Sequence, residues 1–255
     1  MLFLLNTTKL MNLAATTPLR LKATTPQFMN EAKELAFDLR THDAGQLAKL
    51  MALNADLARR TRADYALWGD SGRQQTPALF TFMGLVYKHL DAAGFDAATR
   101  RRAQQKLRII SGLYGLLKPF DLIEAYRLEV GCKYQPLGSK NLVAYWRDKV
   151  TDALNADLRD GEPVISTASQ EYLRVIDIDR LRGPVITPVF KERHSGGKLK
   201  TPVVHAKMAR GALIRDALKT GVKHPRDLMG WSDMGWEAAE EVPQSGPWLF
   251  TRNPR

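Results

Sequence analysis

Short, apolar segments of strand length constrain the fold of this chain more than any other feature. Residues 1–5, 163–166 and 185–190 are four to six residues long and consist mainly of apolar side chains. Runs of this kind are typical of strands that are buried on both faces of a sheet. Between them, apolar residues recur at helical spacing. Because strands and helices alternate irregularly, we predict a mixed α/β (α+β) protein rather than a regular doubly wound sheet.

The spacing of apolar residues along the chain predicts the other elements. Two helices are expected within residues 26–62, and further helices over residues 97–110, 141–158 and 207–220. Alternation and β-branched residues predict strands over residues 125–130, 201–205 and 248–251.

No linker or repeat divides the 255 residues. Glycine and proline are scattered, no low-complexity tract is present, and the length suffices for one hydrophobic core. Residues 1–255 are therefore predicted to form a single compact domain. Because Lys9 ends the first apolar run, this run is interpreted as a buried strand and not as a cleaved leader.

Charge is the most unusual part of the composition. Lys and Arg number 38 and Asp and Glu number 27, which gives a formal net charge of +11. An excess of this size favours polyanionic partners such as nucleic acid, anionic lipid or phosphorylated metabolites. The single cysteine, Cys132, indicates a reducing compartment, so we expect a cytoplasmic protein, and no membrane-spanning segment is visible.

The sequence has no motif of a common metal or cofactor site. Its five histidines are dispersed, and none stands at metal-ligand spacing from another or from Cys132. It also lacks a nucleophile elbow, a P-loop and a dinucleotide fingerprint, which excludes the common hydrolase, NTPase and dehydrogenase classes. We therefore expect neither a metal nor a cofactor.

Residues 107–131, with the sequence LRIISGLYGLLKPFDLIEAYRLEVG, carry the most information. A basic helix meets a Gly-x-x-Gly turn, after which a second short helix is expected, so residues 97–123 have the outline of a helix-hairpin-helix. Its glycines would let a phosphate approach the backbone, and nearby cations would add charge. The predicted DNA contacts are Lys106, Arg108, Ser111, Gly112, Gly115 and Lys118.

A second interpretation of the same turn stays open. Gly112 would then end a helix, and Gly115 would be a position of close packing in a buried turn. On the residues alone, this core turn and a DNA-binding turn are equally well supported. They differ in whether the glycines and their neighbours are accessible.

Taken together, these residues resemble the YaaA family of bacterial peroxide-stress proteins. The similarity includes residues 107–131 and further motifs in the same order: FMGLVY at 82–87, YW at 145–146, ISTASQEY at 165–172, PVF at 188–190, AKMARG at 206–211 and GW at 235–236. It implies a mixed α/β fold of the family's own type with a helix-hairpin-helix. It further implies a cytoplasmic protein that binds double-stranded DNA, affects iron and limits oxidative DNA damage.

The chain departs from the family where its first strand ends. Relatives usually have Ser-Pro-Ala-Lys-Thr-Leu-Asp there, whereas residues 6–12 of this chain read NTTKLMN, and only Lys9 is retained. If this loop lines a reaction site in the relatives, the chemistry here is altered or lost while the fold is kept.

Several polar residues are predicted at strand ends and helix starts, where α/β proteins build pockets. The candidate catalytic residues are Arg127, Glu129 and Glu171, and the candidate anion-binding residues are Lys9, Ser169, Lys207 and Arg210. Each also has a plain structural explanation: an ion pair for Arg127 and Glu129, a helix cap for Ser169, and a solvated basic helix face for the last two. Convergence of these side chains would favour a functional site.

The leading hypothesis is a peroxide-stress protein that binds double-stranded DNA largely independently of sequence and helps to limit oxidative, iron-dependent DNA damage; it leaves open whether the protein is also an enzyme. The alternative is an enzyme that acts on a nucleotide, nucleobase or other phosphorylated substrate in a charged cleft. A third interpretation is a non-catalytic module that binds another protein. Salt-sensitive duplex binding would distinguish the first from the others.

Overall fold

The computed structural model describes residues 1–255 except 16, 18–20, 240 and 255. A twisted sheet of eight strands forms its centre, in the order β4-β3-β1-β6-β7-β10-β9, with β8 paired to the outer part of β7. The strands are β1 (Leu2–Asn6), β3 (Leu107–Ser111), β4 (Gly115–Leu117), β6 (Val164–Ser166), β7 (Val185–Arg193), β8 (Leu199–Lys200), β9 (Glu237–Ala238) and β10 (Gly246–Arg252). Two further strands, β2 (Thr76–Pro77) and β5 (Leu122–Ile123), pair with each other.

The inner strands of the sheet are parallel, and the outer ones are antiparallel. β1 pairs in parallel with β3 and β6, and β7 pairs in parallel with β6 and β10. β4, β8 and β9 each pair antiparallel to a neighbour. The four apolar residues of β1 are at most 2 % exposed, as expected for a strand between two parallel neighbours with both faces covered.

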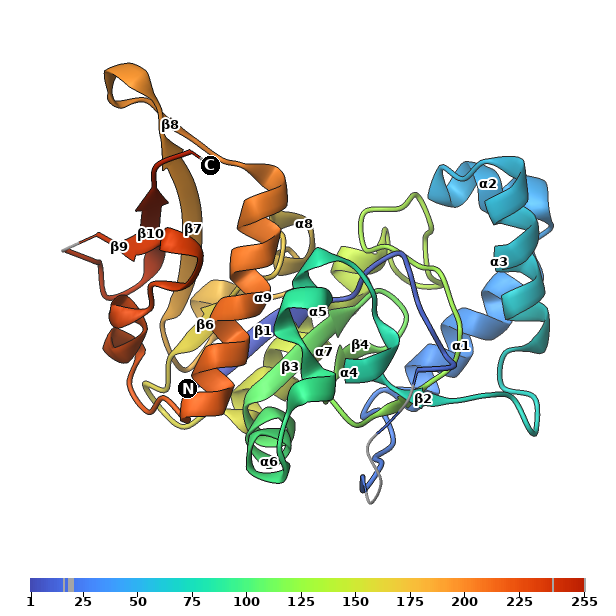
Figure 1. Cartoon of the computed structure of the whole chain (residues 1–255). Coiled ribbons are helices and arrows are strands. Elements are labelled where there is room, and N and C mark those ends of the chain that lie inside the picture. Colours follow the sequence, from blue (N-terminus) through green and yellow to red (C-terminus); the bar gives the residue numbers. More distant parts are fainter. Residues whose placement is uncertain (16, 18–20, 240, 255) are drawn as a thin grey trace.

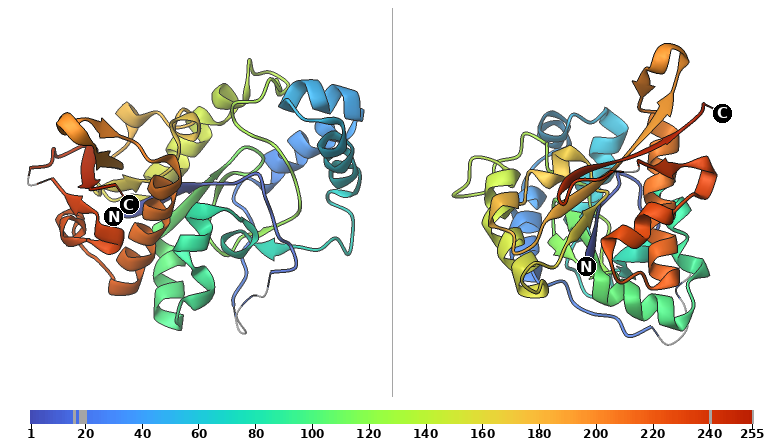
Figure 2. Two further views of the ribbon diagram at one scale, coloured as in Figure 1. Left: turned by 45° about the horizontal axis from the view of Figure 1, so that its top comes forward. Right: turned by 90° about the vertical axis from the view of Figure 1, so that its left-hand side faces the viewer.

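Helices cover both faces of this sheet. Figures 1 and 2 show α5, α6 and α9 on one face and α7 on the other, with α1, α2 and α3 at the far end. The α-helices are α1 (Met29–Arg40), α2 (Ala44–Met51), α3 (Ala55–Leu67), α4 (Ala78–Thr81), α5 (Leu85–Leu90), α6 (Ala97–Lys106), α7 (Leu142–Asp157), α8 (Gln170–Leu173) and α9 (Val203–Thr220). Short 3-10 turns occupy Ala92–Gly94, Ile178–Arg180, Ser195–Gly197, Pro225–Gly230 and Asp233–Gly235. The mixed α/β prediction is confirmed, and the sheet is mostly parallel.

Several predicted elements differ from the observed ones. Residues 26–62 hold three helices and not two, and the predicted strand over residues 125–130 is not formed. The predicted strand over residues 201–205 is instead the start of α9. Val203 and Val204, which suggested a strand, are exposed at the first turn of that helix, where β-branched residues cost little.

The largest correction concerns the predicted helix-hairpin-helix over residues 97–123. α6 ends at Lys106, and β3 and β4 then form an antiparallel hairpin in which Ser111 lies opposite Gly115. The Ser111 hydroxyl accepts the backbone N–H groups of Leu113 and Tyr114 and closes the turn. A buried site beside β1 favours the extended form of the apolar run, so the second helix is not formed.

Candidate functional site

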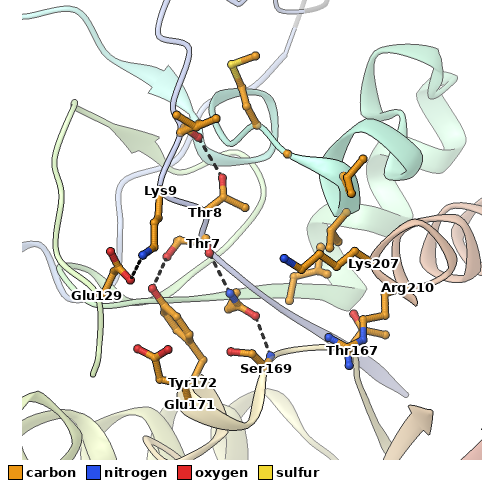
Figure 3. A pocket seen from close by; sticks show the side chains of 17 residues that line it. Thr7, Thr8, Lys9, Glu129, Thr167, Ser169, Glu171, Tyr172, Lys207 and Arg210 are labelled. Atoms are coloured by element: carbon orange, nitrogen blue, oxygen red, sulfur yellow. Dashed lines mark hydrogen bonds and ion pairs between the residues drawn. The ribbon is translucent and has the colours of Figure 1, made fainter. Parts of the chain in front are cut away.

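The sheet reverses its direction of growth at β1. The chain passes from β1 to β3 on one side and later returns to place β6 on the other. In α/β sheets, ligands bind outside the carboxyl ends of the strands at such a reversal. Here a cavity of about 390 Å³ lies between the ends of β1 and β6, α5 and the first turns of α9, and we name it the switch-point pocket. Figure 3 shows its side chains.

Hydrogen bonds between the ends of β1 and β6 hold the floor of this pocket. The Asn6 side-chain oxygen accepts the backbone N–H of Ser169 at 2.8 Å, and the backbone carbonyl of Asn6 accepts the Tyr87 hydroxyl at 3.1 Å. Ser169 precedes α8 as its N-cap, yet its hydroxyl makes no capping hydrogen bond. The helix-cap explanation for this side chain is therefore not realised, and Ser169 lines the pocket.

Glu129 and Glu171 form an acidic side of the pocket. Lys9 lies beside them and contacts Glu129 at 2.9 Å, while Glu171 accepts the backbone N–H of Gly131 at 2.8 Å. The Tyr172 hydroxyl accepts a hydrogen bond from Thr7 at 3.3 Å. Burial, with the charges of Glu129 and Glu171, raises the pKa of Tyr172 to about 12. This phenol therefore stays protonated near neutral pH and can donate a hydrogen bond to a ligand.

Lys207 and Arg210 form the opposite, basic side. They stand three residues apart on α9 and so share a face of the helix, and Figure 3 shows them across the pocket from Glu129. Within the part of the chain that the structure describes, neither side chain makes an ion pair. The Nε of Arg210 is buried without a hydrogen-bond partner, and burial lowers the pKa of this guanidinium. An anion bound here would satisfy both groups.

The structure thus brings together six of the residues that the sequence singled out for a cleft: Lys9, Glu129, Ser169, Glu171, Lys207 and Arg210. Arg127 is not among the described residues that line the pocket. Its backbone carbonyl accepts the Tyr65 hydroxyl at 2.9 Å, and its Nη1 is buried without a partner. Because residues 125–130 do not form a paired strand, Arg127 and Glu129 do not share a wall of this pocket as expected.

The predicted DNA-contact residues lie in a different environment. Arg108 is 4 % exposed; it donates to Asp157 at 2.7 Å and to the carbonyl of Leu107 at 2.7 Å. Lys106 and Lys118 lie beside carboxylates, at 3.2 Å from Glu162 and 4.0 Å from Asp157. Arg108 is therefore paired inside the protein, whereas Lys106 and Lys118 are half exposed, and each lies beside a carboxylate that also contacts another cation.

The turn residues of that hairpin are also enclosed. A Cβ on Gly112 would lie 2.1 Å from the carbonyl oxygen of Leu128, and a Cβ on Gly115 would lie 2.6 Å from the Trp146 ring. Gly115 has a φ of +64°, which favours glycine. Ser111 is 1 % exposed and shares a hydrogen bond with Tyr126 at 2.7 Å. This geometry agrees with the second interpretation of the turn, a closely packed core element.

Several pocket residues with functional groups were not singled out in the sequence, and Thr7 and Tyr172 are two of them. Both stand next to predicted residues, since Thr7 follows the first strand and Tyr172 ends the ISTASQEY motif. The available signal was that Thr7 directly follows an apolar strand and that Tyr172 belongs to a motif that begins with one. Cys132 lies close to this region, and burial raises the pKa of its thiol to about 11.

Neither a metal centre nor a membrane segment stands out. Among the described residues, no three His, Cys, Asp or Glu side chains cluster as metal ligands. No helix in those residues combines the length and the apolar character needed to cross a bilayer.

Comparison with known proteins places the chain in a family. The model of the peroxide stress protein YaaA family matches residues 1–242. A UPF0246 protein of Janthinobacterium sp. (strain Marseille) is 36 % identical over 231 residues, which cover 89 % of each chain. A UPF0246 protein of Flavobacterium johnsoniae is 39 % identical over 233 residues, or 90 % of this chain and 91 % of the relative. These matches show that the chain belongs to the YaaA family of peroxide stress proteins.

Proposed function

We propose that this member of the peroxide stress family binds a small phosphorylated ligand in the switch-point pocket. One observation carries the proposal: Lys207 and Arg210 face a cavity at the carboxyl ends of β1 and β6, and neither has an ion-pair partner among the described residues. Lys207 is exposed, but Arg210 is partly buried. A partly buried cation without a partner costs stability, so the presence of Arg210 at this place favours a function in binding an anion.

The chemistry of the pocket supports a phosphorylated ligand over a plain carboxylate. A guanidinium and an ammonium on one helix face can share the several oxygens of a phosphoryl group. On the other side, the carboxylates of Glu129 and Glu171 accept hydrogen bonds from hydroxyl or amino groups, as acidic residues do from ribose in nucleotide sites. A nucleotide or sugar phosphate offers both kinds of group.

Ligand titration tests this proposal. Calorimetry or thermal shift with orthophosphate, ribose 5-phosphate, nucleoside monophosphates and unphosphorylated nucleosides should show binding of the phosphorylated compounds. Arg210→Met and Lys207→Met should each weaken that binding by about tenfold or more, because a hydrogen bond to a charged group contributes about 1.5–3 kcal/mol. Lys219→Met, which removes an exposed cation from the same helix, is the matched control. If no phosphorylated compound binds, the proposal fails.

The same pocket also supports an enzymatic function. Glu129 and Glu171 could exchange protons with a bound ligand, and Tyr172 could donate a hydrogen bond to it. Incubation of the ligands that bind, followed by phosphorus and proton NMR, would detect a reaction. Glu129→Gln should abolish turnover while it leaves phosphate binding within about threefold of the original. Turnover that survives this substitution would remove Glu129 from the chemistry.

Double-stranded DNA is the second candidate ligand, and the net charge of +11 favours it. A cytoplasmic protein on the chromosome could limit iron-dependent damage during peroxide stress, and the lone cysteine supports that location. Duplex affinity should then fall steeply with salt. Undetectable binding at low salt would exclude DNA, and equal numbers of DNA lesions in peroxide-treated cells with and without the protein would exclude protection.

A further inference from the structure

A second cavity lies beside the switch-point pocket and follows α5. Its lining begins at Met83 and Leu85, at the start of this helix, and ends at Asp91 and Ala93, beyond its last residue. The six residues of α5 rise roughly 9 Å, so the cavity is elongated. Its volume is about 620 Å³. We name it the α5 groove.

Apolar side chains make up most of the α5 groove, and the large ones are Leu79, Phe80, Phe82, Met83, Leu85 and Tyr87. Among the described residues that line it, Asn12, Lys88 and Asp91 are polar. The Asn12 side-chain oxygen already accepts the backbone N–H of Ala14 at 3.1 Å, and the other two are exposed toward the C-terminal end of α5. A nucleobase or a sugar would leave hydrogen-bonding groups without partners in such a groove, whereas a hydrocarbon chain would not.

The α5 groove and the switch-point pocket share a wall that consists of Met83, Gly84 and Leu85. Gly84 has a φ of +120°, which favours glycine, so the middle of this wall carries no side chain. A Cβ at this position would lie 3.6 Å from Thr8, which lines the pocket. A ligand can therefore extend from the pocket into the groove across Gly84.

Two large apolar side chains beside this wall are exposed. Met83 is 46 % exposed, and Leu10, which also lines the switch-point pocket, is 64 % exposed. The two residues are adjacent, because the backbone N–H of Met83 donates to the carbonyl of Leu10 at 3.0 Å. Exposed apolar surface of this kind marks a place where a partner or ligand binds. Next to the cations of the pocket, it favours a ligand that is anionic at one end and apolar at the other.

We infer that the ligand of the switch-point pocket is a free phosphate monoester with an apolar chain, whose phosphate contacts Lys207 and Arg210 and whose chain lies in the α5 groove. This inference rests on the proposed function, because it identifies the organic part of the ligand proposed there. A hydroxyl or amino group close to the phosphate would face Glu129 and Glu171. The elongated groove accommodates a single chain, which suits a free molecule better than the surface of a bilayer.

Alkyl phosphates of increasing chain length test this inference on the full-length protein. Methyl, butyl and hexyl phosphate are titrated by calorimetry, below the concentration at which the longest one aggregates. Each methylene group that becomes buried should increase the affinity about threefold to fourfold. Hexyl phosphate should therefore bind about thirtyfold or more tightly than methyl phosphate, even if some of its methylene groups stay in water.

Two groove variants and one control locate the chain. Ala93→Trp fills the far end of the groove from an exposed position, and Met83→Asn makes the shared wall polar. Ala63→Trp adds the same side chain to an exposed position on α3, at the far end of the molecule, and is the matched control. The ratio of hexyl to methyl phosphate affinity should fall about fivefold or more in at least one groove variant and stay unchanged in the control.

Equal affinity for the three alkyl phosphates, or the same ratio in all variants, would overturn the inference. If the short phosphates still bind in that case, the proposed function stands and only the apolar chain is lost. A nucleoside monophosphate that binds the groove variants more weakly, while the alkyl phosphates do not, would also overturn it and assign the groove to a base. Binding of vesicles that contain phosphatidic acid, without binding of soluble hexyl phosphate, would overturn it in favour of a membrane surface. Failure of every soluble phosphorylated compound to bind would instead contradict the proposed function itself.

Discussion

The β3–β4 hairpin and the switch-point pocket both place basic side chains near the end of a buried strand. In the hairpin region, the buried Arg108 bonds to Asp157 and the half-exposed Lys106 to Glu162, so each of these two cations has a carboxylate partner in the protein. In the pocket, Lys207 and Arg210 have no such partner among the described residues. The comparison shows that a cluster of basic side chains is available to bind an anion only where the folded protein places no carboxylate beside it.

Substitution of Gly112 should have the largest effect on the hairpin side of this comparison. A methyl group on Gly112 would overlap the carbonyl oxygen of Leu128, and Gly112 directly follows β3, so it cannot move away without disturbing that strand. Gly112→Ala should lower the free energy of unfolding by about 4 kcal/mol or prevent folding. Urea denaturation measures this, with Gly230→Ala, where nothing lies within 4 Å, as the control. A change below about 1 kcal/mol would show that the turn is not closely packed.

Replacement of Arg108, the buried cation of the hairpin region, should cause the second largest loss of stability. Arg108→Leu leaves Asp157 without its closest partner and frees several backbone carbonyls, so we expect a loss of about 3 kcal/mol. The double variant Arg108→Leu/Asp157→Asn should recover part of that loss, because no uncompensated charge is left. Chemical denaturation of the two variants checks this. Additive losses would mean that the ion pair does not couple the two residues.

Removal of the cation on the pocket side should hardly affect stability. Arg210→Met exchanges a half-buried guanidinium with an unpaired Nε for an apolar side chain of similar length. The free energy of unfolding should stay within about 1 kcal/mol or increase. A loss as large as that of Arg108→Leu would show that Arg210 is a structural residue and would erase the contrast between the two regions.

The reactivity of the Cys132 thiol reports on the charge of the acidic side of the pocket, and we expect almost no change in stability in this experiment. Burial, with the charges of Glu129 and Glu171, keeps its pKa near 11, whereas the thiolate is the form that reacts with peroxide and alkylating agents. Because a raised pKa favours the protonated thiol, alkylation at about pH 7.5 should be slow and should rise until about pH 11. Glu129→Gln should shift this profile to lower pH. A profile with a midpoint near about 8.5, the value of a free thiol, would contradict the assignment.

The parts of the fold that the sequence predicted are those with a single strong signal. Residues 1–5, 163–166 and 185–190 consist mainly of apolar side chains and correspond to β1, β6 and the first part of β7. Residues 107–110 were misassigned to a helix, because a short apolar run next to a basic helix has no period that identifies a strand. Only its burial beside β1 determines that it is extended.

The sequence could predict which residues belong to the candidate site, but not that they line one cavity or where that cavity lies in the fold. Glu129 and Glu171, or Lys9 and Lys207, are far apart in the chain, and only the strand order brings them to one cavity. Arg127 shows that closeness in the sequence does not place a residue in the site. It is only two residues from Glu129, yet it does not line the pocket. Whether a cation has a partner is also a property of the folded chain, as Arg108 and Arg210 demonstrate.

The buried carboxylate of Glu192 has a mechanical consequence for the basic arm, the ribbon that residues 191–200 form from the end of β7, a turn and β8. One of its oxygens is shared by Arg252 on β10 and His205 on α9, so three elements are fastened where the arm leaves the sheet. The tip beyond it contains two glycines and makes few contacts. A load applied to the tip should therefore bend the arm above this anchor, and the positions of Lys207 and Arg210 should stay unchanged while the arm moves.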